Sequence, residues 1–149
     1  MKAILFAAAL AACATTAAAA PSTIRIAGAW SRPAAAGMNG AGYLTVTNTG
    51  KAPEVLTGAE SPLARKIELH QTSMAGGVMR MTRQDRGVPI PPGGSALFSP
   101  GGDHLMIFGL KKALKSGDRL PVTLIFADGK RMPVTLRVGA DGAGAQAHH

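Results

Sequence analysis

Residues 119–138, RLPVTLIFADGKRMPVTLRV, decide the fold class. Two runs rich in Val, Thr, Leu, Ile and Phe, at 119–127 and 132–138, flank a short polar segment. Residues of these types favour extended strands, and an Asp-Gly pair between two such runs is a strong signal for a tight turn. The segment therefore predicts a β-hairpin with Asp128 and Gly129 at its tip.

The same pattern recurs along the rest of the chain, where short β-rich runs alternate with segments rich in Gly, Pro, Asn and Asp. We find no internal repeat and no sustained helical period. About seven to nine short strands in a chain of this length favour an all-β fold, an antiparallel Greek-key β-sandwich. The other expected strands are 23–30, 40–49, 54–60, 65–71, 78–83, 95–99 and 104–110.

The N-terminus has the pattern of an export signal. Residues 1–12, MKAILFAAALAA, place one lysine before an apolar run that is much shorter than the roughly 20 residues of a membrane-spanning helix. We expect residues 1–20 to be a signal peptide that is cleaved off. The alternative is lipidation, because LAAC (10–13) resembles a bacterial lipobox in which Cys13 would be acylated.

The folded domain is expected to span residues 22–138, followed by a disordered Gly/Ala/His tail at 139–149. A chain of 149 residues is long enough for one domain with a substantial core. Its single cysteine precedes this domain, so the domain must fold without disulfides and bind any metal without thiolate. The final pair, His148 and His149, is either a loose Cu(II) site or an incidental feature.

Charge and motifs exclude several classes of function. The formal net charge is +8, but the lysines and arginines are dispersed and no run exceeds two, which favours a solvated surface over a nucleic-acid interface. The sequence has no G-x-S-x-G motif, no candidate nucleophilic cysteine in the domain and no closely spaced pair of carboxylates. We therefore expect a protein that is not an enzyme.

A second stretch, ELHQTSMAGGVMRM (68–81), places three methionines near His70. Side chains alternate faces along a strand, so His70 faces away from the core if the isoleucine and leucine before it face inwards. The Ala-Gly-Gly segment in the middle predicts a hairpin turn that returns Met79 and Met81 towards His70.

HLMIF (104–108) supplies a matching pair of donors. His104 and Met106 lie two residues apart in an expected strand, with Cα atoms about 6.5–7 Å apart, so both side chains can converge on one ion. Thioether sulfur is neutral and soft, which selects Cu(I), whereas a structural zinc site would use the cysteines that this domain lacks. Methionine and histidine can also pack as ordinary core, but two histidines that each lie near methionine favour a metal site.

The spacing of these residues is similar to a known signature. His70, ten residues, Met81, twenty-two residues and then His104-x-Met106 resembles H-x10-M-x21-H-x-M of the PCuAC family of periplasmic copper(I) chaperones. The one extra residue falls in a Gly/Pro-rich segment, where an insertion is easily absorbed. The resemblance also includes AWSRP (29–33), GAGYLTVTN (40–48), GGVMRM (76–81), PPGG (91–94) and HLMIFGLKK (104–112), and it covers residues 24–138.

Two residues depart from that family's usual pattern outside the signature. Asp103 stands where an aromatic residue often precedes the ligand histidine, and Phe108 stands where methionine is common. The aspartate could alter the charge beside a bound copper ion.

The resemblance implies a cupredoxin-like sandwich that binds Cu(I) through His70, Met81, His104 and Met106. It implies a periplasmic copper chaperone that carries copper to the CuA centre of cytochrome c oxidase or a similar acceptor, with a Sco-type thioredoxin-fold protein and oxidase subunit II as partners. We expect the protein to be a monomer. A blue-copper electron carrier would need a cysteine ligand. The remaining alternative is an extracytoplasmic binding module without metal, in which Met and His are core. Met74 and Met79 lie outside the signature.

Overall fold

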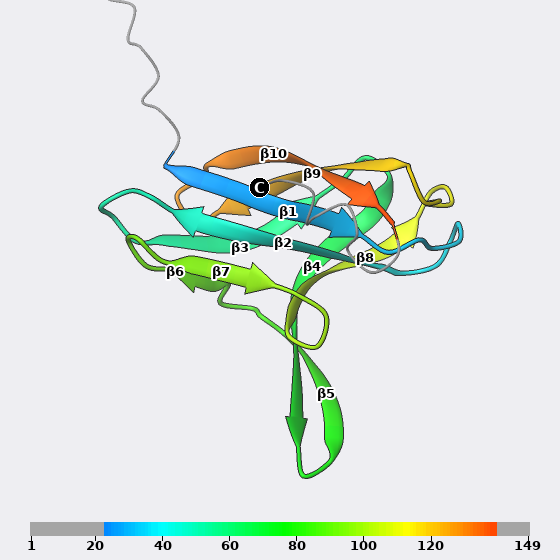
Figure 1. Ribbon diagram of the computed structural model, residues 1–149, viewed down its shortest axis with the longest axis horizontal. Helices are drawn as coiled ribbons and strands as arrows, with labels where there is room; N and C mark the ends of the chain where they lie inside the picture. Colours follow the sequence, from blue (N-terminus) through cyan, green and yellow to red (C-terminus); the bar gives the residue numbers. More distant parts are fainter. Residues whose placement is uncertain (1–22, 140–149) are drawn as a thin grey trace, which may run out of the picture.

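The computed structural model describes residues 23–139, and this part of the chain is all-β (Figure 1). The expected strands are present, with ends shifted by a residue or a few. The strands are β1 (Ile24–Ser31), β2 (Gly40–Asn48), β3 (Glu54–Glu60), β4 (Ala64–Ala75), β5 (Val78–Arg83), β6 (Val88–Ile90), β7 (Ser95–Phe98), β8 (Asp103–Leu110), β9 (Arg119–Phe126) and β10 (Arg131–Val138).

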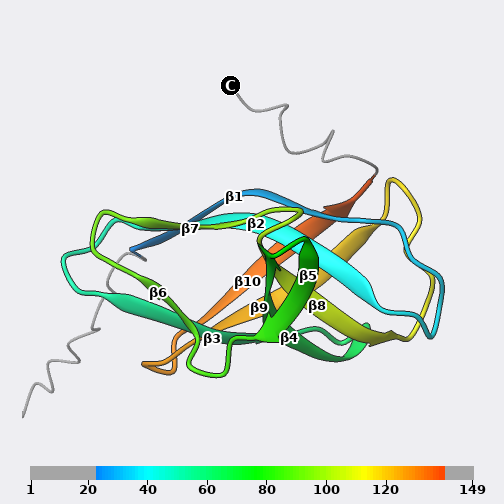
Figure 2. The same cartoon turned by 90° about the horizontal axis from the view of Figure 1, so that it is seen from below.

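The strands form one sheet that curls into a closed sandwich. Its order is β5-β4-β8-β7-β2-β1-β10-β9-β3-β6, and an added β3–β4 pairing joins the two sides. Figure 2 shows β7, β2 and β1 lying over β6 and β3. The expected cupredoxin-like Greek-key sandwich is confirmed. Most pairings are antiparallel, but β1 pairs with β10, and β7 with β8, in parallel.

The β9–β10 hairpin follows the sequence closely. Asp128 and Gly129 form its turn, and Gly129 has a φ of 87°, which a residue without a Cβ adopts at no steric cost. Alternate residues of β9 are fully buried. These are Leu120, Val122, Leu124 and Phe126, and they pack in the core with Leu44, Leu56, Phe98 and Leu105.

Strand β6 was not expected, because its Pro89 lies in a stretch that has the composition of a turn. Proline lacks the N–H that a central strand would donate, so it is tolerated mainly at sheet edges. β6 is the last strand of the sheet and pairs with β3. The first and last residues of β6, Val88 and Ile90, are buried in the core, which explains why three residues suffice to form the strand.

Strand β4 is longer than the expected 65–71 and continues to Ala75. Together with β5 it forms a hairpin that projects from the body of the sandwich (Figure 1). Gly76 and Gly77 form its turn with φ values of 59° and 78°, which is the pattern of a two-residue type I′ turn. Every residue of β5 is exposed.

The expected signal peptide at 1–20, Cys13 and residues 140–149 of the expected tail lie outside the described residues. In residues 23–139 no helix is long and apolar enough to cross a membrane.

Candidate metal centre

Strands β4, β5 and β8 are neighbours in the sheet and supply the candidate ligands. Residues directly opposite each other on paired strands project to the same face. The facing pairs are His70 with His104, Glu68 with Met106, and Thr72 with Met81. Leu69 and Leu105 alternate with these residues and are buried in the core. The predicted ligands therefore share the face that points away from the core, as the alternation indicated.

A pocket of about 270 Å³ opens on this face. Met81, His104 and Met106 line it, together with Met79, and His70 is not among its lining residues. The ring of His70 lies beside that of His104 with 5.9 Å between centroids. The structure thus brings three of the four predicted ligands into one pocket and holds the fourth next to it.

His104 is buried, with 5% of its surface exposed, and only one of its ring nitrogens has a protein partner. Its Nδ1–H donates to the carbonyl of Gly102 at 3.2 Å. The neutral ring therefore has its lone pair on Nε2, and this atom is buried without a partner. The other fully buried polar side chains of the described region, Ser31 and Asn48, both have hydrogen-bond partners.

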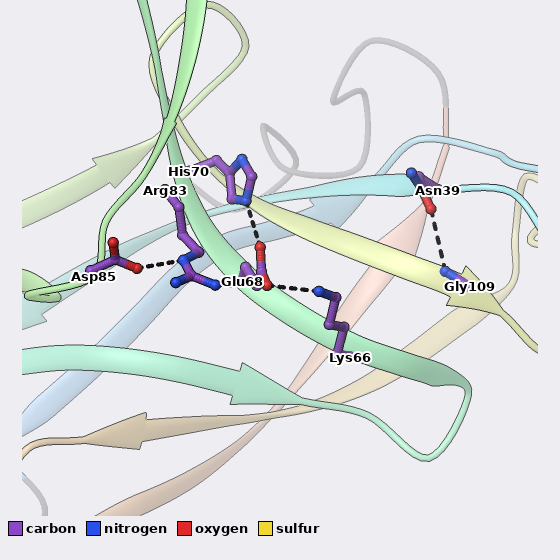
Figure 3. A network of polar contacts seen from close by, with 7 residues as sticks. All are labelled: Asn39, Lys66, Glu68, His70, Arg83, Asp85 and Gly109. Carbon is purple, nitrogen blue, oxygen red and sulfur yellow. Dashed lines mark hydrogen bonds and ion pairs between the residues drawn. The ribbon is translucent and has the colours of Figure 1, made fainter.

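His70 presents the same feature through its other nitrogen. Its Nε2–H donates to Oε2 of Glu68 at 2.9 Å (Figure 3). This bond, followed by the hydrogen bond from Lys66, lowers the pKa of Glu68 to about 2, so the carboxylate is ionised and can only accept. The lone pair of neutral His70 is therefore on Nδ1, which is buried without a partner.

The surroundings of Glu68 and His70 fix this arrangement. Glu68 also accepts from Lys66 at 2.9 Å, and Arg83 lies 3.4 Å from the same oxygen. Phe108 packs with its ring centroid 5.9 Å from that of His70. Lys66 in turn lies 4.7 Å from the centre of the Phe108 ring. Phe108 thus supports the histidine from the side.

Asp103 does not belong to this group. Its side chain alternates with His104 on β8, and its Oδ1 accepts a hydrogen bond from Gln84 at 3.2 Å. The Asp103 carboxylate is therefore held by a hydrogen bond from Gln84.

The separation of the two imidazole rings is compatible with a shared ion. A metal–nitrogen bond of about 2.0–2.1 Å places a ring centre about 3 Å from the ion, so two rings that share it have centres up to about 6 Å apart. The separation of His70 and His104 is 5.9 Å. Met106 is half-buried and Met81 is 55% exposed, so Met106 is the more enclosed of these two pocket-lining methionines.

The described residues offer no alternative cluster of hard or thiolate ligands. Residues 23–139 contain no group of three or more His, Cys, Asp or Glu side chains that could hold a metal ion.

Sequence reasoning missed three contributors to the site. Glu68 binds His70, and the shared parity of the two residues on β4 was the available signal. Arg32, in the loop before β2, and Tyr43, in β2, line the pocket, and no local pattern connects them with β8. Met79, which the predicted turn returns towards His70, also lines the pocket.

Comparison with known proteins gives a consistent result. The model of the LpqE-like lipoprotein family matches residues 24–138. A protein of Leifsonia xyli subsp. xyli (strain CTCB07) that is named as a lipoprotein is 36% identical over 126 residues, covering 85% of this chain and 75% of that protein.

Two solved structures with copper in their names are similar to the fold. The copper-bound PCuAC domain from PmoF2 superimposes with a TM-score of 0.66 and 25% identity, covering 80% of this chain and 94% of that domain. The solution structure of CuI-DR1885 from Deinococcus radiodurans has a TM-score of 0.56 and 31% identity, covering 78% of this chain and 79% of that chain.

Proposed function

The chain belongs to the LpqE-like lipoprotein family, which is related to the PCuAC domains, and on this premise we propose that it is a Cu(I)-binding copper chaperone. The observation that carries the proposal is the pair of unpartnered buried nitrogens, His104 Nε2 and His70 Nδ1. Leaving a buried polar atom unpaired costs about 1–3 kcal/mol, so two such atoms on neighbouring rings support a missing ligand.

The ligand set supports Cu(I) as the cargo. Met81 and Met106 supply neutral thioethers, and His70 and His104 supply neutral imidazoles, a combination suited to a soft monovalent ion. The CuI-DR1885 and copper-bound PmoF2 structures support the same assignment through their likeness to this fold. The alternative, a sandwich without metal in which these residues are core, is disfavoured because Met81 is exposed and each histidine has one buried ring nitrogen without a partner.

The different exposure of the ligands suggests an order of release. Met81 is 55% exposed on a projecting hairpin, whereas His104 is buried. An incoming thiolate of an acceptor protein would replace Met81 first, because it can reach that side of the ion without displacing protein atoms. Met106 and the histidines would follow as further thiolates arrive, so the ion need never be released to water.

We extend the proposal to the destination of the copper. The acceptor is the CuA centre of cytochrome c oxidase or a similar copper site, and the partners are a Sco-type thioredoxin-fold protein and oxidase subunit II, as the PCuAC signature implies. The protein acts as a periplasmic monomer without enzymatic activity. The family name is consistent with an anchored form through Cys13, and mass spectrometry of the mature N-terminus distinguishes acylated Cys13 from cleavage near residue 20.

Anaerobic competition with a chromogenic Cu(I) chelator tests the central claim. The wild-type protein should withdraw one equivalent of Cu(I) from the chelator. Met106→Leu keeps the size of the side chain but removes the sulfur, and it should weaken binding. Met38→Leu is the matched control, because Met38 is 60% exposed and does not line the pocket. A wild type that withdraws no copper, or equal affinities for the two variants, would rule out this site.

A further inference from the structure

The β4–β5 hairpin exposes an unusual amount of apolar surface. Within residues 23–139 six large apolar side chains are more than half exposed, and four of them lie on this hairpin. They are Met74, Val78, Met79 and Met81, with 54–66% of their surface exposed. Single exposed apolar residues are common, but a group on one projecting element indicates a function.

The sulfur atoms of this group are confined to one face. Met74 is directly opposite Met79, and Thr72 is directly opposite Met81. Both pairs project to the face that carries His70 and His104, and Met79 and Met81 line the pocket. The other face of the hairpin carries no sulfur; its residues are Ser73, Ala75, Val78 and Arg80. Of the chain's seven methionines, four therefore project to the face of the metal centre.

This distribution favours a metal over a protein partner as the occupant. A docking surface would be served by any apolar side chain, whereas here the large exposed apolar residues of the pocket face are all methionine and that of the opposite face is valine. Directly opposite residues of an antiparallel pair have Cβ atoms roughly 4.5–5.5 Å apart, so two long thioether side chains can meet on one ion. Neutral sulfur donors without a carboxylate select soft monovalent ions.

We propose that Met74 and Met79 form a second, outer site for a soft monovalent cation, Cu(I) or Ag(I), at the tip of the hairpin. Met79 and Met81 then lead from this site into the pocket, because both line it. The outer site is weaker than the inner one, since it has two exposed thioethers and no imidazole. The destination of the ion rests on the proposed function, but the outer site itself does not.

Titration with silver nitrate in chloride-free buffer, followed through the ¹³C-labelled methionine methyl groups by NMR, tests the outer site. The methyl signals of Met81 and Met106 should shift with the first equivalent of Ag(I). Those of Met74 and Met79 should shift with the second. Met38 is the internal control, because it is similarly exposed and lies outside the hairpin. Unchanged Met74 and Met79 signals, or a simultaneous shift of Met38, would overturn the proposal.

A variant without the inner site separates this proposal from the proposed function. In Met106→Leu with His104→Ala, the signals of Met74 and Met79 should shift with the first equivalent of Ag(I). If the outer site exists but the inner one does not, the Met74 and Met79 signals of the wild type also shift with the first equivalent of Ag(I). If the outer site is wrong, the double variant shows no shift at these two residues.

The kinetic role of the outer site is tested by the rate of loading. Met74→Leu should lower the observed rate of Ag(I) uptake about threefold to tenfold, within the range over which association rates of related variants differ. The affinity of the inner site should stay the same, because Met74 does not line the pocket, and Met38→Leu should load like the wild type. Met74 is exposed, so the fold is not at risk. An unchanged loading rate would remove the outer site from the path of the ion.

Discussion

The β9–β10 and β4–β5 hairpins begin from the same local chemistry and end in opposite roles. Each has β-rich strands around a short turn with glycine at positive φ. In β9 every second residue is buried in the core. In β5 no residue is buried. One hairpin uses its apolar side chains to hold the sandwich together, and the projecting part of the other leaves them at the surface beside a pocket.

The polar contacts of the two hairpins differ in the same sense. Lys130, after the β9–β10 turn, donates to Glu54 at 2.6 Å and ties the turn to β3. Glu68, at the base of the β4–β5 hairpin, binds His70 and leaves one of its nitrogens without a partner. The hairpin that serves stability has its polar groups paired, whereas the one that serves binding keeps a nitrogen lone pair free to bind a metal.

The largest expected effect separates the two hairpins by stability. Leu124→Ala in β9 should lower the free energy of unfolding by about 2–5 kcal/mol, because it opens a cavity in a fully buried part of the core. Met79→Leu in β5 should change it by less than about 0.5 kcal/mol, since that side chain is exposed. Urea denaturation of the apo protein measures both. Similar losses in the two variants would contradict the division of roles.

His104→Ala should have a large effect on Cu(I) binding and a small effect on stability, the opposite of Leu124→Ala. Loss of a hydrogen-bond partner of a metal-bound histidine lowers metal affinity about 10–100-fold. Cu(I) affinity should fall by more than this in His104→Ala, because a ligand of the ion itself is removed. The stability of the apo protein should fall much less than in Leu124→Ala, since the change also deletes a buried nitrogen without partner. Chelator competition and urea denaturation give the two values. An unaltered copper affinity would remove His104 from the site.

Glu68→Gln sharpens the comparison within the binding hairpin. The amide can occupy the same space but does not oblige His70 to donate from Nε2, so the histidine loses the tautomer that keeps its Nδ1 lone pair free. Cu(I) affinity should fall about tenfold, as for other partners of metal-bound histidine. Glu54→Gln, at the other hairpin, is the control and should leave the affinity unchanged. Equal affinities for the two variants would deny Glu68 a positioning role.

The smallest effect is the acid sensitivity of the apo protein. The pKa of Glu68 is lowered from 4.5 to about 2 in the folded state, mainly by its hydrogen bond with His70. Ionised Glu68 therefore stabilises the fold fully above pH 4.5, and this contribution is lost as the pH falls towards 2. Denaturation curves across this range should show a shallower decline for Glu68→Gln than for the wild type. Parallel declines would mean that the carboxylate does not stabilise the fold.

Much of the sandwich could be predicted because strand patterns are local. The hairpin at Asp128 and Gly129, and the faces of Leu69 and Leu105, followed from turn residues and from alternation. Strand β6 could not be found this way, because Pro89 is acceptable only where the sheet ends, and position in a sheet is not a local property. The parallel β1–β10 and β7–β8 pairings could not be predicted for the same reason.

The sequence by itself determined the kinds of donor, their spacing and the faces on which they lie, because side chains alternate along any strand. Only the tertiary structure decided which atoms are free to bind. The register of β4 against β8 sets His70 beside His104, and Glu68 and the carbonyl of Gly102 each occupy one ring nitrogen and leave the other. Burial and hydrogen-bond partners depend on strands far apart in the chain, so no local pattern contains them.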